Sequence, residues 1–253
     1  MTQTTRALFP AMALALGFAL LGLFSTAADA ASISYGNFGP VPPGVMFLNV
    51  TESSSTDPVP LFGPPAPFAT GLDFDPMNFG AAGASGSGDI TDGQLNFTVM
   101  SPGINTIGVS EAGDYSLIGI GTPATSVFAG ASLRVKVTHI NGIDVPDINL
   151  SQSNASVGFN LVANPGVLQP WSIGILVDVA AQLTALGVPG NATKAEVVIN
   201  DQLIALSEAA SAAFIAKKEF VIDVDSEIPE PSTLALASAA LCGLGLSASR
   251  RRR

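Results

Sequence analysis

Cysteine is almost absent from this 253-residue sequence, and its one instance, Cys242, lies in an apolar segment near the C-terminus. The region between the two chain ends has none, so it has no disulfide, no thiol nucleophile and no thiolate metal ligand. Histidine is equally rare, with His139 alone, which excludes a zinc site built on a pair of histidines. The fold must therefore be stabilised by the burial of apolar side chains.

Basic side chains are also scarce. Residues 31–228 hold five lysines and arginines against eighteen acidic side chains, which gives this region a net charge of −13. Nucleic-acid binding needs clustered lysine and arginine, so the charge argues against DNA, RNA and anionic membrane surfaces as partners. An acidic surface instead suits a soluble extracellular protein that repels its neighbours and attracts cations.

The N-terminal segment has the pattern of a secretory signal peptide. One arginine, Arg6, precedes an apolar run over residues 7–24, and Ala28-Asp29-Ala30 follows as a small-x-small cleavage pattern. We expect the Sec translocon to export the chain and signal peptidase to cleave it, so that the mature chain begins at Ala31. An uncleaved anchor is the alternative, because the apolar run is long.

The C-terminal segment combines a proline motif, a short apolar run and a basic end. Pro229-Glu230-Pro231 precedes the apolar residues 234–246, and the chain closes with Arg250, Arg251, Arg252 and Arg253. As a helix rising about 1.5 Å per residue, the run spans roughly 20–24 Å, which is shorter than the ~30 Å hydrocarbon core of a bilayer. It therefore favours transient retention over a permanent anchor, with the arginines on the cytoplasmic side.

This arrangement resembles the PEP-CTERM sorting domain of Gram-negative bacteria. The resemblance rests on Ile228 to Ser232, the Leu/Ala/Gly-rich segment behind them and the arginine tail, roughly a tenth of the chain. It implies recognition by the membrane transpeptidase exosortase, cleavage near the motif, and transfer from the inner membrane to the cell surface or extracellular matrix. An ordinary tail anchor that contains Pro-Glu-Pro is the alternative.

The expected domains are a signal peptide (1–30), an exported domain (31–228) and a sorting signal (229–253).

The exported domain has the composition of an all-β protein, with few charges and abundant Gly, Ser, Thr, Asn and Val. Alternation is cleanest over 94–100 and 131–140, and Asn141-Gly142 after the second run predicts a hairpin into 143–150. Further strands are expected at residues 32–38, 44–52, 155–162, 171–179, 195–200 and 219–225. Short strands at this spacing favour a sandwich or a closed sheet. We expect an antiparallel, jelly-roll-like β-sandwich between the signal helix and the C-terminal hydrophobic helix.

Four segments lack a clear strand pattern. Residues 53–68 are rich in Ser, Thr and Pro and predict a surface loop, because proline cannot donate to a β-ladder. Residues 80–88 contain only Gly, Ala and Ser and predict a flexible or tightly turned stretch. Residues 179–186 predict a short helix ended by a glycine. Residues 202–218 fit a helix by propensity, or two strands joined near residues 209–211 by context, and we expect the strands.

Acidic clusters provide the candidate metal ligands. Calcium takes six to eight oxygen ligands from bent loops. Two such clusters, one of them in a predicted turn at 89–93, offer the carboxylates Asp73, Asp75, Asp89 and Asp92. Neither fits the twelve-residue calcium loop, and ordinary turn chemistry is the alternative. A third cluster, Asp223, Asp225 and Glu227, alternates along the last strand and predicts a solvated face.

The sequence contains no recognisable catalytic motif. A Ser-His-Asp triad would need His139, but the chain has no G-x-S-x-G motif, and the similar Gly83 to Ser87 fails at its last position. Trp171 is the only tryptophan. An exposed Trp171 ring would bind the apolar face of a sugar, whereas a buried ring would pack in the core.

These observations predict a non-enzymatic exported protein with a structural or adhesive role in exopolysaccharide or a biofilm. A carbohydrate- or calcium-binding module of that matrix is the first alternative, and a secreted hydrolase is the second. No cofactor other than calcium is expected. The expected partners are exosortase, the inner membrane transiently, and an extracellular polysaccharide or envelope glycan.

Overall fold

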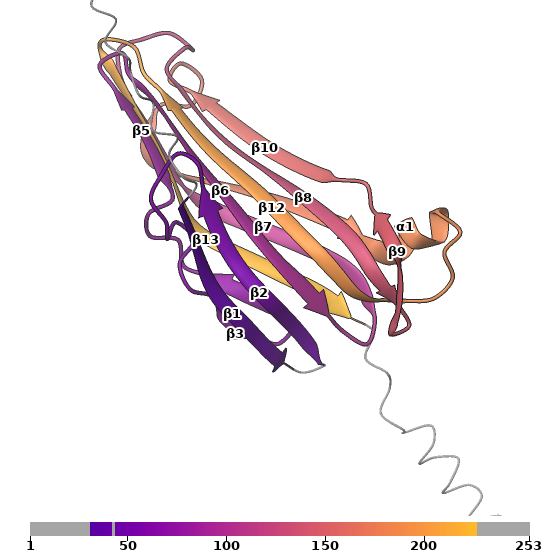
Figure 1. The fold of residues 1–253 in the computed structure, drawn as a ribbon. Helices are drawn as coiled ribbons and strands as arrows, with labels where there is room; N and C mark the ends of the chain where they lie inside the picture. Colours follow the sequence, from indigo (N-terminus) through magenta and orange to yellow (C-terminus); the bar gives the residue numbers. More distant parts are fainter. Residues whose placement is uncertain (1–30, 42–43, 227–253) are drawn as a thin grey trace, which may run out of the picture.

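The computed structural model describes residues 31–41 and 44–226 and folds them into two antiparallel β-sheets packed face to face (Figure 1). Two sheets each bury one face against the other, which is how a domain without disulfides builds a single core. The predicted β-sandwich is therefore confirmed, while its jelly-roll subclass stays a prediction.

The first sheet, sheet A, has seven strands: β1 (Ala31–Val41), β2 (Val45–Ser54), β6 (Gly88–Met100), β8 (Ser126–Ile140), β9 (Ile143–Asn149), β10 (Ser153–Asn160) and β12 (Ala192–Leu206). The second sheet, sheet B, has six: β3 (Ala66–Phe68), β4 (Gly71–Phe74), β5 (Gly80–Ala84), β7 (Ile104–Gly119), β11 (Gly166–Asp178) and β13 (Ser211–Ser226). Within the described ranges one helix is present, α1 (Val179–Ala185).

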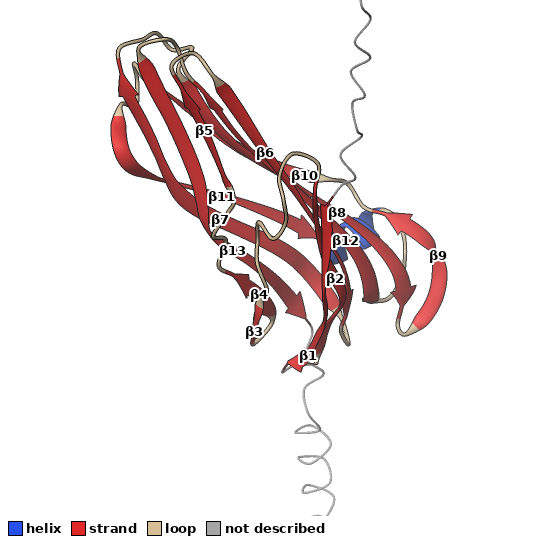
Figure 2. Ribbon diagram, turned by 60° about the vertical axis from the view of Figure 1, so that its left-hand side comes forward, coloured by secondary structure: helices blue, strands red, loops and turns tan. Residues whose placement is uncertain are grey.

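Strand order places the longest strands at the centre of each sheet. Sheet A runs β1-β2-β6-β12-β8-β10 with β9 beside β8, and sheet B runs β11-β7-β13-β4-β3 with β5 beside β13. Figure 1 shows β6, β12, β8 and β10 side by side along the front of an elongated molecule, with sheet B behind them. Figure 2 shows the twist of the sheets and the β8–β9 hairpin, which projects beside α1.

The core follows from strict alternation in the central strands of sheet A. Odd-numbered residues are buried over 91–99 in β6, 127–137 in β8 and 195–205 in β12, and the even-numbered ones point outward. Register then joins apolar partners across three strands, as in the row Phe97, Val197 and Val135. Each fully buried side chain of this kind contributes about 1.5–3 kcal/mol.

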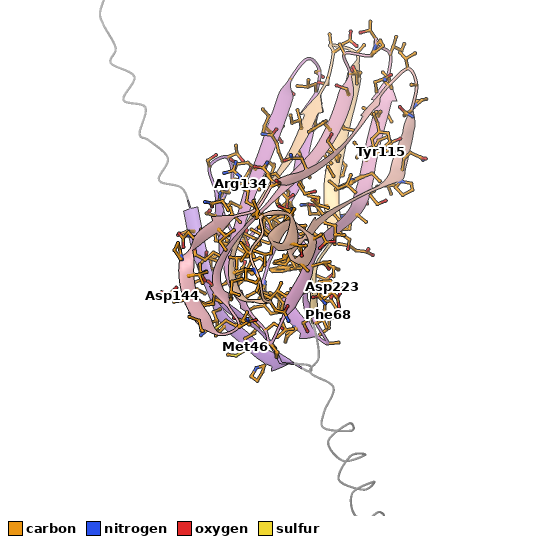
Figure 3. The ribbon with its side chains drawn as sticks, turned by 90° about the vertical axis from the view of Figure 1, so that its right-hand side faces the viewer. Met46, Phe68, Tyr115, Arg134, Asp144 and Asp223 are labelled. Carbon is orange, nitrogen blue, oxygen red and sulfur yellow. The ribbon has the colours of Figure 1, made fainter. Side chains whose placement is uncertain are left out.

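Three aromatic contacts extend this core. Phe62 makes edge-to-face contacts with Phe79 and Phe220, with ring centroids 4.9 Å and 4.8 Å apart. At the far end, Tyr115 of β7 stacks on Phe159 of β10 at 4.2 Å and so joins the two sheets. Figure 3 shows Tyr115 toward one end of the sandwich, with Met46 and Phe68 toward the other.

Local signals in the sequence predicted several connections correctly. Asn141 and Gly142 have φ values of 50° and 79°, as a two-residue type I′ hairpin requires. Helix α1 is capped by Asp178, whose carboxylate accepts a hydrogen bond from Ala181 N, and Gly187 follows it with φ 70°. Residues 202–218 belong to β12, a turn at 207–210 and β13, which confirms the two strands.

Three other predictions are wrong in whole or in part. Residues 80–84 form β5, and only 85–87 form the predicted tight turn, while the predicted turn at 89–93 is part of β6. Residues 53–68 are more than a surface loop, because they contain β3 and the buried side chains of Leu61 and Phe62. The backbone N–H groups of Leu61 and Phe62 donate to the buried carboxylate of Glu52, which fixes this segment against the core.

Strand β7 is absent from the sequence prediction although it lies inside sheet B. Its inward positions include Glu111 and Gly113, which interrupt the apolar alternation. Gly113 is required by close packing, since a Cβ there would lie 1.9 Å from Ala216 O and 2.9 Å from Trp171 Nε1. The glycine that interrupts the apolar alternation of β7 is therefore required by the packing of the neighbouring strands.

Several predicted features lie outside the described residues. These are the cleavage positions Ala28 and Ala30, the motif Pro229, Glu230 and Pro231, the C-terminal helix, and Arg250 to Arg253. Ala31 is the first residue of β1. Over 31–41 and 44–226, no helix has the length and apolar character needed to cross a membrane.

We predict that Gly113→Ala lowers the free energy of unfolding by about 3 kcal/mol or more, because the new methyl group overlaps the Ala216 carbonyl. Thermal and urea denaturation followed by circular dichroism would measure this. Gly174→Ala on β11 is the matched control, since its Cβ would lie 3.8 Å from the nearest atom, Val109 O. The control should be within about 1 kcal/mol of the parent, and equal destabilisation by both variants would contradict the close approach at Gly113.

Candidate functional site

A groove of about 750 Å³ crosses the outer face of sheet A. Strands β6, β12 and β8 line its middle, and residues 53–55 and 154–156 line its two sides. Figure 1 looks onto this face, with the four strands from β6 to β10 running across it. A concave surface with several converging polar groups is the usual form of a ligand site.

One row of polar side chains runs across the groove from strand to strand. β-Ladder register places five uncharged residues opposite one another in turn: Ser53, Gln94, Asn200, Ser132 and Asn154. Directly opposed residues of antiparallel strands have Cβ atoms about 4.5–5.5 Å apart. The row therefore presents a continuous line of hydroxyl and amide groups and no formal charge.

Hydrogen bonds within the row fix the orientation of its amides. Gln94 Nε2 donates to Asn200 Oδ1 at 2.6 Å, and Asn200 Nδ2 donates to Ser132 Oγ at 3.4 Å. From the next row, Asn96 Nδ2 donates to Gln94 Oε1 at 3.2 Å. A primary amide has two donors and two acceptor lone pairs, so each amide keeps hydrogen-bonding capacity for a ligand. The groups are thus preorganised without being saturated.

An aromatic ring lies beside the row. Phe128 of β8 is 37% exposed, and its ring covers Gly130, where a Cβ would be only 2.7 Å from the nearest ring carbon. The ladder puts Phe128 opposite Ile204, which in turn faces Ile90. Glycine at position 130 therefore allows the ring to lie along the sheet, and this end of the groove is apolar.

The opposite end of the same face is charged. Lys136 Nζ lies 2.7 Å from Glu196 Oε2 and 3.0 Å from Asp147 Oδ2, and hydrogen bonds to these carboxylates raise the pKa of Lys136. Arg134, labelled in Figure 3, donates from Nε to Gln152 Oε1 at 2.7 Å. Along the strands, the face therefore grades from apolar through neutral polar to charged.

Asp92 shapes one side of the groove. Its carboxylate accepts hydrogen bonds from Ser54 Oγ at 2.9 Å, Ser55 N at 2.8 Å and Thr56 N at 3.1 Å. Burial alone would raise the pKa of Asp92, but the hydrogen bonds from these residues outweigh it and lower the pKa. Asp92 is therefore an ionised anchor for the turn after β2, and its acceptor sites are already engaged.

The other predicted metal ligands are not brought together. Asp89 accepts a hydrogen bond from Ala82 N, while Asp73 and Asp75 are exposed on and just after β4. In the part of the chain that the structure describes, no group of three or more His, Cys, Asp or Glu side chains is arranged to hold a metal ion. The four aspartates therefore do not form one calcium cage. Asp223 and Asp225 lie on an exposed strand face, as predicted.

Of the two roles considered for Trp171, the exposed sugar-binding ring is not the one that the structure shows. Trp171 is 4% exposed, and its Nε1 donates to Ala216 O at 3.2 Å, so it packs between β11 and β13. A second hollow of about 610 Å³ borders this residue, with Lys218 and Glu219 at its rim. Packing of Trp171 in the core is confirmed, and the exposed aromatic ring beside the groove is that of Phe128.

His139 is not part of a catalytic triad. Its Nδ1 lies 3.2 Å from Thr138 Oγ1 and 3.7 Å from Asp144 Oδ1, in the β8–β9 hairpin. Among the described residues, no hydrogen bond joins His139 to a serine. The Gly83 to Ser87 segment that resembled a nucleophile motif comprises the end of β5 and the turn into β6.

Apart from Asp92, sequence reasoning missed the residues of the groove. Gln94, Ser132, Asn154 and Asn200 occupy outward positions of strands, where polar residues are ordinary, and Phe128 precedes the predicted strand at 131–140. The alternation in β6 and β8 did predict that individual residues such as Gln94 and Ser132 face outward. Their assembly into one row depends on pairing between distant strands, which no local pattern contains.

Comparisons with known proteins give little further guidance. No protein-family model matches the chain, and no curated protein matches it in sequence. Among solved structures, the carbohydrate-binding module TmCBM61 in complex with β-1,4-galactotriose is 10% identical, with 79% of this chain and 90% of that chain covered and a TM-score of 0.21.

Two further structures are similar at the same level. A family 35 carbohydrate-binding module from Clostridium thermocellum is 12% identical over 76% of this chain and 98% of its own, with a TM-score of 0.16. Endoglucanase 3 of family GH12 from Trichoderma harzianum is 12% identical over 78% and 99%, with a TM-score of 0.22. Likeness at these TM-scores says nothing about what this chain binds.

Proposed function

We propose that the described domain is a carbohydrate-binding module that holds a neutral glycan in the groove of sheet A. The observation that carries this proposal is the in-register row Ser53, Gln94, Asn200, Ser132 and Asn154 beside the exposed ring of Phe128.

The chemistry of the row matches that of a sugar. Each sugar hydroxyl both donates and accepts a hydrogen bond, and so do the amides and hydroxyls of the row. The C–H face of a sugar ring is apolar and packs on an aromatic ring, which Phe128 supplies. The row bears no formal charge although the domain as a whole is acidic. That contrast favours a neutral ligand over a phosphate or a uronate.

The length of the row favours an oligosaccharide over a single sugar. Four gaps between five adjacent strands, each about 4.8 Å, amount to roughly 19 Å. Along this line the groove is lined from the turn after β2 to β10. A ligand that contacts the whole row must therefore be longer than one sugar ring.

We predict that Asn200→Ala and Phe128→Ala each weaken glycan binding at least tenfold. Loss of a hydrogen-bonding partner costs about 1–3 kcal/mol, and tenfold corresponds to about 1.4 kcal/mol. Isothermal titration calorimetry with neutral α- and β-linked oligosaccharides, and one uronate oligosaccharide, would measure this.

Ser172→Ala is the matched control, because this exposed β11 residue borders the second hollow. The control should bind like the parent. Absence of heat with every neutral glycan would remove the proposed function. Loss of binding in Ser172→Ala alone would move the site to sheet B.

We also propose that the chain is exported and sorted by an exosortase to the cell surface or extracellular matrix. Support comes from the signal-peptide pattern before Ala31 and from Pro229-Glu230-Pro231 with its apolar run and arginine tail. A glycan-binding domain delivered there would have a structural or adhesive role in exopolysaccharide. This role requires no catalysis.

Deletion of residues 229–253 is expected to abolish attachment at the surface and leave the domain free in the medium or periplasm. Cell fractionation and intact-mass measurement of the mature protein would follow both outcomes. Replacing Arg250 to Arg253 by lysines keeps the basic end and should leave sorting intact. A truncated protein that reaches the same surface in the same covalent form would refute the sorting proposal.

A further inference from the structure

A buried lysine lies between two buried carboxyl groups at the centre of the sandwich. Lys217 Nζ is 2.7 Å from Asp201 Oδ2 and 2.8 Å from Glu111 Oε2. The three residues are 1%, 3% and 3% exposed, respectively. Lys217 and Glu111 belong to β13 and β7 of sheet B, whereas Asp201 belongs to β12 of sheet A. The cluster therefore spans the interface between the sheets.

Aromatic rings surround the lysine nitrogen. The ring centroids of Phe79, Phe220 and Phe62 lie 4.4, 4.8 and 5.1 Å from Nζ, and all three side chains are buried. Away from water, a charged ammonium or carboxylate loses its hydration. The neutral forms of these groups therefore become more stable relative to the ions.

The carboxyl group of Asp201 is set up to be neutral. Burial raises the pKa of Asp201 well above its ordinary value, and the Glu111 carboxylate adds to this effect, against the opposing charge of Lys217. One lysine cannot neutralise two carboxylates, so a proton on Asp201 leaves the cluster with no net charge. A carboxylic acid is also attacked by an amine more readily than a carboxylate is, because it carries no negative charge and its hydroxyl can leave as water.

We propose that Lys217 and Asp201 join in an intramolecular isopeptide bond, with Glu111 transferring the protons. The carboxyl groups of Asp201 and Glu111 both lie within hydrogen-bonding distance of the Lys217 nitrogen, so the nucleophile, the group it attacks and a group that can transfer protons are in contact. The reaction needs no oxidant, metal or second substrate. It is independent of whether the groove binds a glycan.

The atoms balance as a condensation. The Lys217 ammonium gives a proton to Glu111, and the resulting amine attacks Cγ of Asp201. Glu111 then passes its proton to the departing hydroxyl and takes one from the nitrogen, so the Cγ–O bond breaks and the Nζ–Cγ amide forms. The products are the amide, one water molecule and a protonated Glu111. An ion pair buried among phenylalanines is replaced by neutral groups.

Peptide mapping of the full chain tests the proposal directly. Trypsin cleaves after Lys194, Lys217 and Lys218, so both partners fall in one stretch of sequence. We expect a peptide of residues 195–218, uncut after Lys217 and lighter by one water, with no backbone fragments between residues 201 and 217 in tandem mass spectrometry. A peptide 195–217 of full mass from the folded protein would overturn the proposal.

Two variants separate the proposed chemistry from other losses of water. Glu111→Gln keeps the size of the side chain but removes the proton acceptor, and it should give the linear peptide cut after Lys217. Glu196→Gln removes an outward carboxylate of β12 and should keep the link. Full linkage in Glu111→Gln would overturn the role of Glu111. If that variant does not fold, the map of the unsubstituted chain still decides whether the bond exists.

Discussion

The pairing of β12 with both β6 and β8 is the constraint on which the rest of the structure depends. It makes β12 the central strand of sheet A and fixes which of its side chains face the core. Asn200 and Gln202 line the groove, whereas Asp201 between them turns inward to Lys217. A slip of one residue would exchange these roles, burying amides and exposing the ion cluster. One register therefore sets the outer surface and the interior chemistry together.

Buried phenylalanines and a buried carboxylate fix the long connection after β2 against the core. Phe62 belongs to the long connection after β2, and the Glu52 carboxylate holds the backbone N–H groups of Leu61 and Phe62 in place. The same carboxylate accepts a hydrogen bond from Tyr35 OH at 2.5 Å, and burial is the main cause of the raised pKa of Tyr35. Hydrogen bonds to the buried Glu52 carboxylate thus hold the β2–β3 connection against the core without a disulfide. Phe62 of this connection completes the aromatic cluster.

Much of the fold was predictable from local pattern, because alternation, an Asn-Gly turn and a glycine that ends a short helix each act within a few residues. Strand β7 was not, because Glu111 and Gly113 occupy inward positions where apolar residues were expected. The inward position of Lys217 was not predictable either, since a β-bulge next to it changes which residues of β13 face the core. The groove was invisible for a different reason. Its residues come from five strands that meet only after folding, while Trp171, the obvious sugar platform, is needed in the core.

The gradient along the outer face of sheet A has a consequence for assembly. Phe128 and Ile90 mark one end of this face, and Lys136 with its carboxylates marks the other. The two directions along a strand are therefore chemically unequal, and a bound polymer meets different neighbours on its left and right flanks. A polysaccharide is itself a directed chain with two distinct ends. Domains bound along one such chain would therefore share a single orientation. The apolar end of sheet A would lie on the same flank of the polysaccharide in every domain.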